Sequence, residues 1–148
     1  MNPLELSEQE AIRRNSLAML RQMGIEPYPA ALYPVDATST DIRANFKDDA
    51  SEQRQVCIAG RIMSRRIMGK ASFVELQDNA GRIQVYVARD EICPGEDKDL
   101  YNVVFKKLLD IGDIVGFKGF VFRTQTGEIT VHAREMTLLS KSLRPLPI

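Results

Sequence analysis

Four residues that suit contacts to nucleic acid stand near one another in the sequence. Arg65 and Arg66 close the first expected strand, Phe73 opens the second, and Gln84 lies in the third. Single-stranded nucleic acid presents bare bases and phosphates. A protein that reads it therefore needs a ring for stacking, polar groups for the base edges and cations for the backbone. These residue types favour a nucleic-acid interface.

Alternation along the second and third strands predicts that Phe73 faces solvent. The inward face of these strands is expected to carry Val74, Leu76, Ile83, Val85 and Val87. Phe73 and Glu75 then share the outer face with Gln84 and Tyr86. Burial of Phe73 under the preceding segment, and an ordinary surface role for Gln84, are the alternatives. Glu128 follows the last expected turn and lies near the basic face, where it also fits an ordinary turn residue.

The distribution of charge separates two parts of the chain. The 148 residues carry 20 basic and 20 acidic side chains, but residues 1–53 hold 5 and 9 of them, and residues 54–148 hold 15 and 11. The stretch 54–70 contains five basic residues and no acidic one. The second part is therefore the candidate polyanion binder, although a solvated strand and loop would show the same charge.

Other chemistry finds little support in the composition. Two cysteines without CxxC spacing and a single histidine, His132, make a thiolate or imidazole metal cluster implausible. His132 sits in an alternating apolar run, which is typical of a strand. A small hydrolase built on Asp78, Glu75 and His132 lacks a convergent motif. No apolar window is long enough for a membrane span and no secretory signal is visible, so a soluble cytoplasmic protein is expected.

The first 53 residues are expected to form a helix and a connector. Ser7 and Glu10 have capping-box spacing, which predicts that the helix begins there, and Gly24 is placed to end it. An apolar stripe predicted to pack on a neighbour comprises Ile12, Met19, Leu20 and Met23, and the residues off this stripe are Arg13, Arg14 and Arg21. Residues 25–53 hold three prolines and read as a packed connector with a short helix near Thr40.

From residue 54 the pattern is typical of a small barrel. Period-two runs predict three strands, then a helix within residues 97–113 that Gly112 ends, then two strands joined at Thr126-Gly127. This order matches a mainly β, five-stranded OB-fold Greek-key barrel with a helix between strands 3 and 4. A flat α+β sandwich competes with it, but glycines inside strands (Gly60, Gly116 and Gly119) favour closure. The expected division is residues 1–53 and 54–148.

Three long motifs resemble one known family. The stretches "RIMGKASFVELQDNAGRIQVYVARDE", "FKKLLDIGDIVGFKGFVFRTQTGEITVHA" and "LLSKSLRPLP" resemble the N-terminal anticodon-binding domain of bacterial class II (IIb) lysyl-tRNA synthetases. The resemblance covers nearly the whole chain, including the N-terminal helix and "GIEPYPA". The related aspartyl and asparaginyl enzymes share the use of an aromatic residue and a glutamine for the anticodon. The motifs "RRIMGKASF" and "SLRPLP" resemble the lysyl enzymes instead.

The resemblance implies a role for each candidate residue. Phe73 would stack on the central uridine of a UUU anticodon, while Arg66 and Gln84 would hydrogen-bond its edge or backbone. Glu128 would help to read a neighbouring base. By the same resemblance, the phosphate contacts would come from Arg65 and Lys70, and a further stacking partner for an outer anticodon base would be His132.

The same resemblance implies a larger enzyme. A full-length member would attach lysine to tRNA with ATP and magnesium, and would be a homodimer. Its catalytic domain would begin just after Pro147, and no class II catalytic motif occurs in the 148 residues. We therefore expect this chain to bind the tRNA anticodon loop, to hold no cofactor and to be inactive alone. A stand-alone OB-fold binder of single-stranded nucleic acid or tRNA, and a protein-contact role for the N-terminal helix, are the alternatives.

Overall fold

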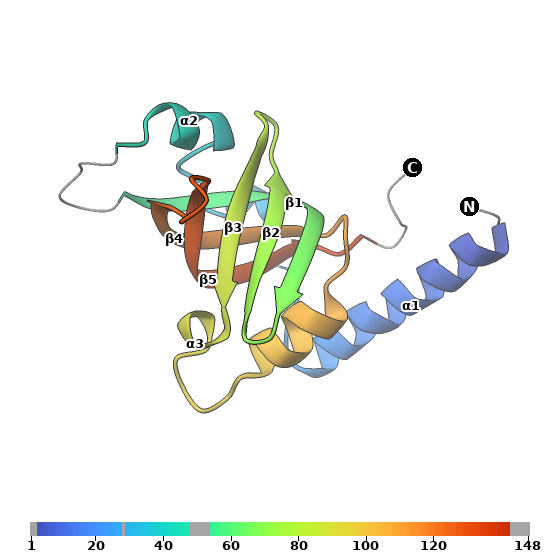
Figure 1. Ribbon diagram of the computed structural model, residues 1–148. Coiled ribbons are helices and arrows are strands. Elements are labelled where there is room, and N and C mark those ends of the chain that lie inside the picture. Colours follow the sequence, from blue (N-terminus) through green and yellow to red (C-terminus); the bar gives the residue numbers. More distant parts are fainter. Residues whose placement is uncertain (1–2, 28, 48–53, 143–148) are drawn as a thin grey trace.

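Five strands form the sheet of the computed structural model, which describes residues 3–27, 29–47 and 54–142 (Figure 1). In chain order the strands are β1 (Gln55–Met68), β2 (Ala71–Gln77), β3 (Arg82–Ala88), β4 (Ile114–Arg123) and β5 (Ile129–Ser140). The inward side chains predicted for β2 and β3 are all 0–2% exposed. The predicted faces of these two strands are therefore confirmed.

The strands pair so that the sheet closes on itself. β1 pairs antiparallel with β2 on one side and with β4 on the other. β2 pairs antiparallel with β3, β3 pairs parallel with β5, and β5 pairs antiparallel with β4. The resulting order β1-β2-β3-β5-β4 is that of a five-stranded Greek-key barrel. The OB-fold prediction is confirmed, and the flat sandwich is wrong.

Glycines in the strands allow close approach of other groups to the barrel wall. A Cβ atom at Gly60 would meet the carbonyl of Gln77, and one at Gly119 would meet the carbonyl of His132. A Cβ at Gly116 would collide with the ring of Tyr33, which comes from the connector. The close approach between strands expected from the sequence is therefore confirmed at Gly60 and Gly119, whereas Gly116 makes room for a side chain.

Short helical segments occupy the connector and the ends of the barrel. They are η1 (Ala30–Leu32), α2 (Ser39–Ala44), α3 (Arg89–Ile92) and η2 (Leu100–Leu108). Thr38 caps α2 by accepting from the Asp41 amide, so the short helix predicted in the connector is confirmed. The helix predicted between strands 3 and 4 is also present as η2, with π-helical turns, and it closes the lower end of the barrel in Figure 1. Its buried residues include Tyr101, Val104, Phe105 and Leu108.

The N-terminal helix α1 (Pro3–Gln22) begins earlier than the capping box predicts. Ser7 lies inside the helix, so the predicted start is wrong. Pro3 is the first helical residue, a position where the missing proline N–H costs no hydrogen bond. The predicted end is confirmed, because Gly24 follows the helix with φ +81.

The buried face of α1 is also different from the predicted apolar stripe. Ile12, Met19 and Met23 are 56%, 41% and 39% exposed, and of the stripe only Leu20 is buried. Arg13 and Ser16 share the face of Leu20 and are buried with it. The side chain of Arg13 is held there by backbone carbonyls, and these hydrogen bonds are what the apolar pattern could not reveal.

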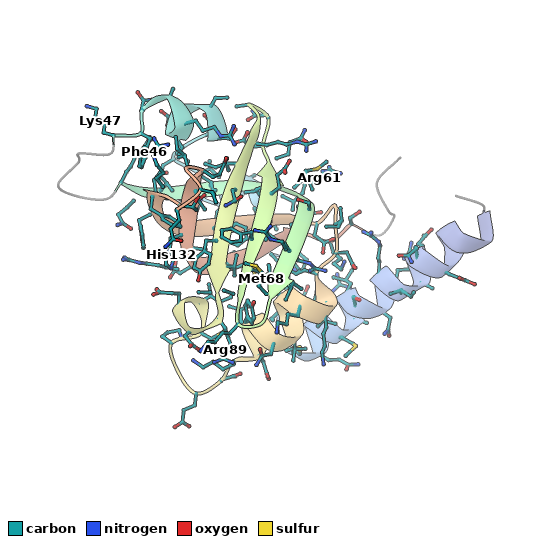
Figure 2. All side chains as sticks on the ribbon, in the orientation of Figure 1. Phe46, Lys47, Arg61, Met68, Arg89 and His132 are labelled. Carbon is teal, nitrogen blue, oxygen red and sulfur yellow. The ribbon has the colours of Figure 1, made fainter. Side chains whose placement is uncertain are left out.

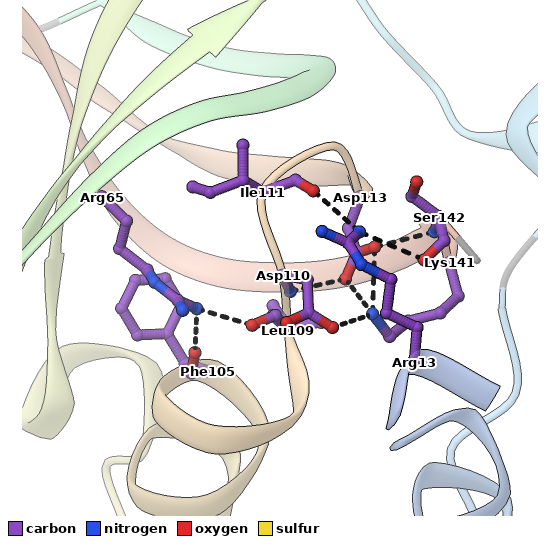
Figure 3. Close-up of polar contacts among 9 residues, drawn as sticks. All are labelled: Arg13, Arg65, Phe105, Leu109, Asp110, Ile111, Asp113, Lys141 and Ser142. Carbon is purple, nitrogen blue, oxygen red and sulfur yellow. Dashed lines mark hydrogen bonds and ion pairs between the residues drawn. The ribbon is translucent and has the colours of Figure 1, made fainter. Parts of the chain in front are cut away.

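A buried ionic cluster joins α1, the loop that precedes β4 and the residues that follow β5 (Figure 3). The Lys141 ammonium donates to Asp110 and, at 3.1 Å, to Asp113, whose side chain is fully buried. Arg13 Nη1 donates to the carbonyls of Ile111 at 3.0 Å and Ser142 at 3.4 Å. The cluster fixes α1 against the barrel beside the end of β5. In the part of the chain that the structure describes, no helix is long and apolar enough to span a bilayer.

Candidate nucleic-acid interface

A groove of about 600 Å³ opens on the outer face of β1, β2 and β3. We call it the outer groove. Its lining residues are Arg43, Ser64, Arg65, Arg66, Phe73, Val74, Glu75, Arg82, Ile83, Gln84 and Glu128. Four arginines and two glutamates make the lining basic, which suits a polyanion. Five of the seven residues singled out from the sequence are brought together here, and Lys70 and His132 lie outside the lining.

Phe73 is half-exposed on this face and is covered on one side by an arginine. It is the register partner of Arg66 in β1 and of Tyr86 in β3. The Arg66 guanidinium lies 5.3 Å from the Phe73 ring centroid, and the Tyr86 ring lies 5.3 Å away at 56°. The alternative of Phe73 buried under the connector is therefore wrong, and the ring stands where a base can stack on it.

Polar groups that can meet base edges stand in the register row next to Phe73. Gln84 is the partner of Glu75 across β2–β3, and its Nε2 donates to Thr130 Oγ1 at 3.3 Å. Arg82 forms an ion pair with Glu75. An amide, a carboxylate and a guanidinium therefore stand beside a half-buried ring, which is the set of groups that recognises an unpaired base.

Glu128 lies at the rim of the outer groove in an ion pair with Arg43, which was not expected from the sequence. Arg43 Nη2, from α2, donates to Glu128 Oε1 at 2.9 Å, and both side chains are about half exposed. The pair brings the connector to the barrel face. No local pattern links residues so far apart in the chain, so only the tertiary structure could identify Arg43.

The Arg65 side chain is directed toward η2 (Figure 3). Its Nη1 donates to the carbonyls of Phe105 at 2.7 Å and Leu109 at 2.8 Å, which lie at the C-terminal end of the helix. Burial lowers its pKa, and Asp110 and Asp113 oppose that effect. Arg65 therefore satisfies helix carbonyls in this structure, and its contact to phosphate stays a prediction.

Lys70 and His132 do not line the outer groove. Lys70 is exposed in the β1–β2 turn. His132 lies in β5, where its ring stacks on Phe120 at 4.6 Å and 29° and meets Tyr86 edge-on at 5.0 Å. Burial lowers its pKa from 6.5, and Arg134 adds to that effect while Glu91 opposes it. In Figure 2, His132 lies between Phe46, near α2, and Arg89, near α3.

A single register row connects the groove to His132 and beyond. Direct Cα partners run from Phe73 in β2 through Tyr86 in β3 and His132 in β5 to Phe120 in β4. We call these four residues the aromatic row. Phe120 was not singled out from the sequence. Its alternation with buried Val121, read as it was in β2, would have placed it on the outer face.

The residues of the alternative hydrolase have other partners. Asp78 accepts hydrogen bonds from Ser39 and from the amides of Ala80 and Gly81. Glu75 pairs with Arg82, and His132 stacks on Phe120. Within residues 3–27, 29–47 and 54–142 no hydrogen bond joins any two of Asp78, Glu75 and His132. The same ranges contain no cluster of three histidine, cysteine or carboxylate residues that could hold a metal ion.

A small closed barrel with half-buried rings, an amide and exposed arginines on its outer face defines a domain that binds single-stranded nucleic acid. Comparison with known families agrees, since residues 56–139 match the tRNA anticodon family, described as an OB-fold nucleic acid binding domain. The chain belongs to this family of OB-fold nucleic acid binding domains.

Curated relatives extend the similarity to the whole chain. The chain is 67% identical over its full length to the N-terminal region of a lysine–tRNA ligase of Porphyromonas gingivalis, and covers 26% of that protein. Lysine–tRNA ligases of Christiangramia forsetii and Aeromonas salmonicida are 61% and 51% identical over 97% of the chain, which covers 25% and 28% of them. The chain thus spans about a quarter of the length of these relatives.

Proposed function

We propose that this chain recognises the anticodon loop of the tRNA that accepts lysine. The observation that carries the proposal is the outer groove, in which a half-exposed phenylalanine under an arginine stands beside an amide and a carboxylate. The sequence identity to lysine–tRNA ligases supports the choice of tRNA. In this proposal Phe73 stacks on the central uridine of UUU, and Arg66 and Gln84 bind its edge or backbone.

Discrimination would come from the polar groups around the ring. A base with the wrong edge leaves Gln84 or Arg66 without its hydrogen-bond partner after water has been displaced, which costs about 1–3 kcal/mol. Glu128 would read a neighbouring base either after its ion pair with Arg43 has opened or while its carboxylate contacts both groups. His132 would stack on an outer anticodon base, and Lys70 and Arg65 would contact phosphate.

The proposal extends to the protein of which this domain would form part. That protein would attach lysine to tRNA in the cytoplasm as a homodimer, with ATP and magnesium bound by a separate catalytic domain. Residues 54–148 would be the anticodon-binding domain and residues 1–53 its N-terminal helix and connector. The chain by itself would supply recognition of the tRNA and none of the ligation chemistry.

Fluorescence anisotropy with anticodon stem-loops tests this function. The unchanged chain should bind a UUU loop about five-fold or more tightly than a loop whose central base is C, from the cost of one unpaired edge. Phe73→Leu keeps an apolar side chain and should abolish the difference. Arg66→Gln should weaken both complexes, whereas Arg61→Gln, exposed on the same strand outside the groove, should weaken neither.

Two results would contradict the proposal. Equal and salt-sensitive binding of both loops would indicate the alternative, a general OB-fold binder of single-stranded nucleic acid. Failure to bind the stem-loop and intact tRNA, at low salt and with a folded protein by circular dichroism, would reject nucleic-acid recognition by this face.

A further inference from the structure

The aromatic row carries an arginine at both ends, and only one end is used in the proposed function. Arg66 lies over Phe73 at 5.3 Å, and Arg134 lies over Phe120 at 4.8 Å. Most arginines on the surface are paired with a carboxylate, among them Arg43, Arg54 and Arg82. Within the described ranges neither Arg66 nor Arg134 forms such a pair.

The Phe120 end resembles the Phe73 end in exposure as well as in composition. Phe120 is half-exposed and Arg134 is exposed, and both lie on the outer face that Phe73 and Tyr86 occupy. His132 backs the Phe120 ring at 4.6 Å. An aromatic ring covered by a guanidinium can take a base by stacking on the ring or on the guanidinium plane, while the cation meets a phosphate.

Distance along the row indicates which nucleotide could reach this end. Strands lie ~4.8 Å apart, so Phe120 stands roughly 14 Å along the row from Phe73. Successive stacked bases are only ~3.4 Å apart, so this span cannot be one base step. With Phe73 assigned to the central base and His132 to an outer one, the next ring in the row corresponds to the first nucleotide outside the triplet.

We propose that Phe120 and Arg134 form a second nucleotide subsite, which binds the base and phosphate of a nucleotide flanking the anticodon triplet. The proposal rests on the proposed function, because the order of bases along the row starts from Phe73. It adds a contact outside the coding triplet, so it would raise affinity for a loop without changing which triplet is read.

Abasic substitutions in the stem-loop test the subsite. Three UUU loops are compared by fluorescence anisotropy: one intact, one abasic immediately 5′ of the triplet and one abasic immediately 3′ of it. For the unchanged chain, one abasic loop should bind about five-fold or more weakly, as expected for one lost stacking contact. Phe120→Leu should bind the intact loop and that abasic loop equally, and should keep its discrimination between U and C at the central position.

Matched variants separate stacking and charge at this subsite from general effects. Phe46→Leu removes another phenylalanine that lies under an arginine, Arg123, but stands outside the aromatic row, so it should leave the abasic difference intact. Arg134→Gln should lower the slope of log affinity against log salt by about one, whereas Lys118→Gln on the neighbouring strand should not.

The outcomes distinguish this subsite from the proposed function. If the unchanged chain separates U from C but neither abasic loop binds more weakly, the subsite is rejected and the function stands. The subsite is also rejected if Phe120→Leu retains the abasic difference, or if Phe46→Leu removes it. If the unchanged chain does not separate U from C, both proposals are rejected together.

Discussion

Arg66 and Phe73 are direct partners across β1 and β2, with the guanidinium 5.3 Å from the ring centroid. The ring therefore has a cation over it before any ligand is present. Such a contact is worth about 0.5–1 kcal/mol at an exposed site. It holds the guanidinium beside the place where a base and its phosphate would lie, so little ordering remains to be done on binding.

Replacement of Arg66 by lysine tests this geometry. Lysine keeps the charge but loses the planar fork that can donate to a base edge and lie over a ring. Arg66→Lys should keep the salt dependence of stem-loop binding and lose most of the discrimination between U and C. Affinity measured at several salt concentrations separates the two effects. Retention of full discrimination by Arg66→Lys would show that only the charge matters.

The Arg43–Glu128 pair predicts a change in binding without a change in stability. An exposed ion pair of this kind contributes about 0–1 kcal/mol. Arg43→Gln should therefore shift the urea midpoint little, but it leaves the carboxylate uncompensated at the rim of the groove and should weaken RNA binding. Arg14→Gln, which breaks an exposed pair on α1, is the matched control for both measurements. Equal RNA affinity of the two variants would contradict the prediction.

The two faces of β2 and β3 could be predicted from the sequence because these two strands alternate strictly. Val74 and Leu76 point inward in β2, and their spacing alone placed Phe73 on the outer face. The same rule would have found Phe120 in β4. By contrast, the burial of Arg13 could not be predicted, since an arginine inside a helix face depends on carbonyls that come from residues 111 and 142.

Arg65 illustrates the same limit within the candidate site. Its neighbour Arg66 and the basic turn suggest a contact to phosphate, but its side chain reaches the end of η2, forty and more residues further along the chain. Charge patterns show that a segment is basic. They do not show which basic side chain donates to an otherwise unpaired helix carbonyl, because that hydrogen bond depends on tertiary packing.

Close approach at Gly60 predicts a strong effect of one added methyl group. A Cβ there would lie 2.5 Å from the carbonyl oxygen of Gln77, which belongs to the backbone of β2 and cannot move aside as a side chain could. Gly60→Ala should therefore lower the free energy of unfolding by about 1–3 kcal/mol. Gly95→Ala, which meets nothing within 4 Å, should leave it nearly unchanged in the same urea titration. Similar midpoints for the two variants would refute the argument.

The buried Lys141 should be difficult to replace. Its ammonium compensates Asp113, which is fully buried, and Asp110, which is partly buried. Burial raises the pKa of Asp113, while the hydrogen bond from the Asp110 amide and the charge of Lys141 oppose that effect. Lys141→Met leaves a buried carboxylate without its partner, which should cost about 3–5 kcal/mol in urea unfolding. Lys118→Met, whose ion pair with Glu135 is exposed, should cost less than about 1 kcal/mol.

The hydrogen bonds to the Asp78 carboxylate lead us to expect a loss of stability in acid. Burial raises its pKa, but hydrogen bonds from Ser39, Gly81 and Ala80 outweigh that effect and hold the pKa below its ordinary value of 3.8. A carboxyl whose pKa is lower in the folded state stabilises the protein above its unfolded pKa, and that contribution is lost as the pH falls through the lower folded value. The stability difference between the unchanged chain and Asp78→Asn should therefore be constant from pH 7 to about 5 and should shrink below pH 4. Glu96→Gln, at an exposed position, should run parallel to the unchanged chain throughout. A difference for Asp78→Asn that stays constant down to pH 2 would show that the hydrogen bonds at this turn do not depend on the charge of the carboxylate.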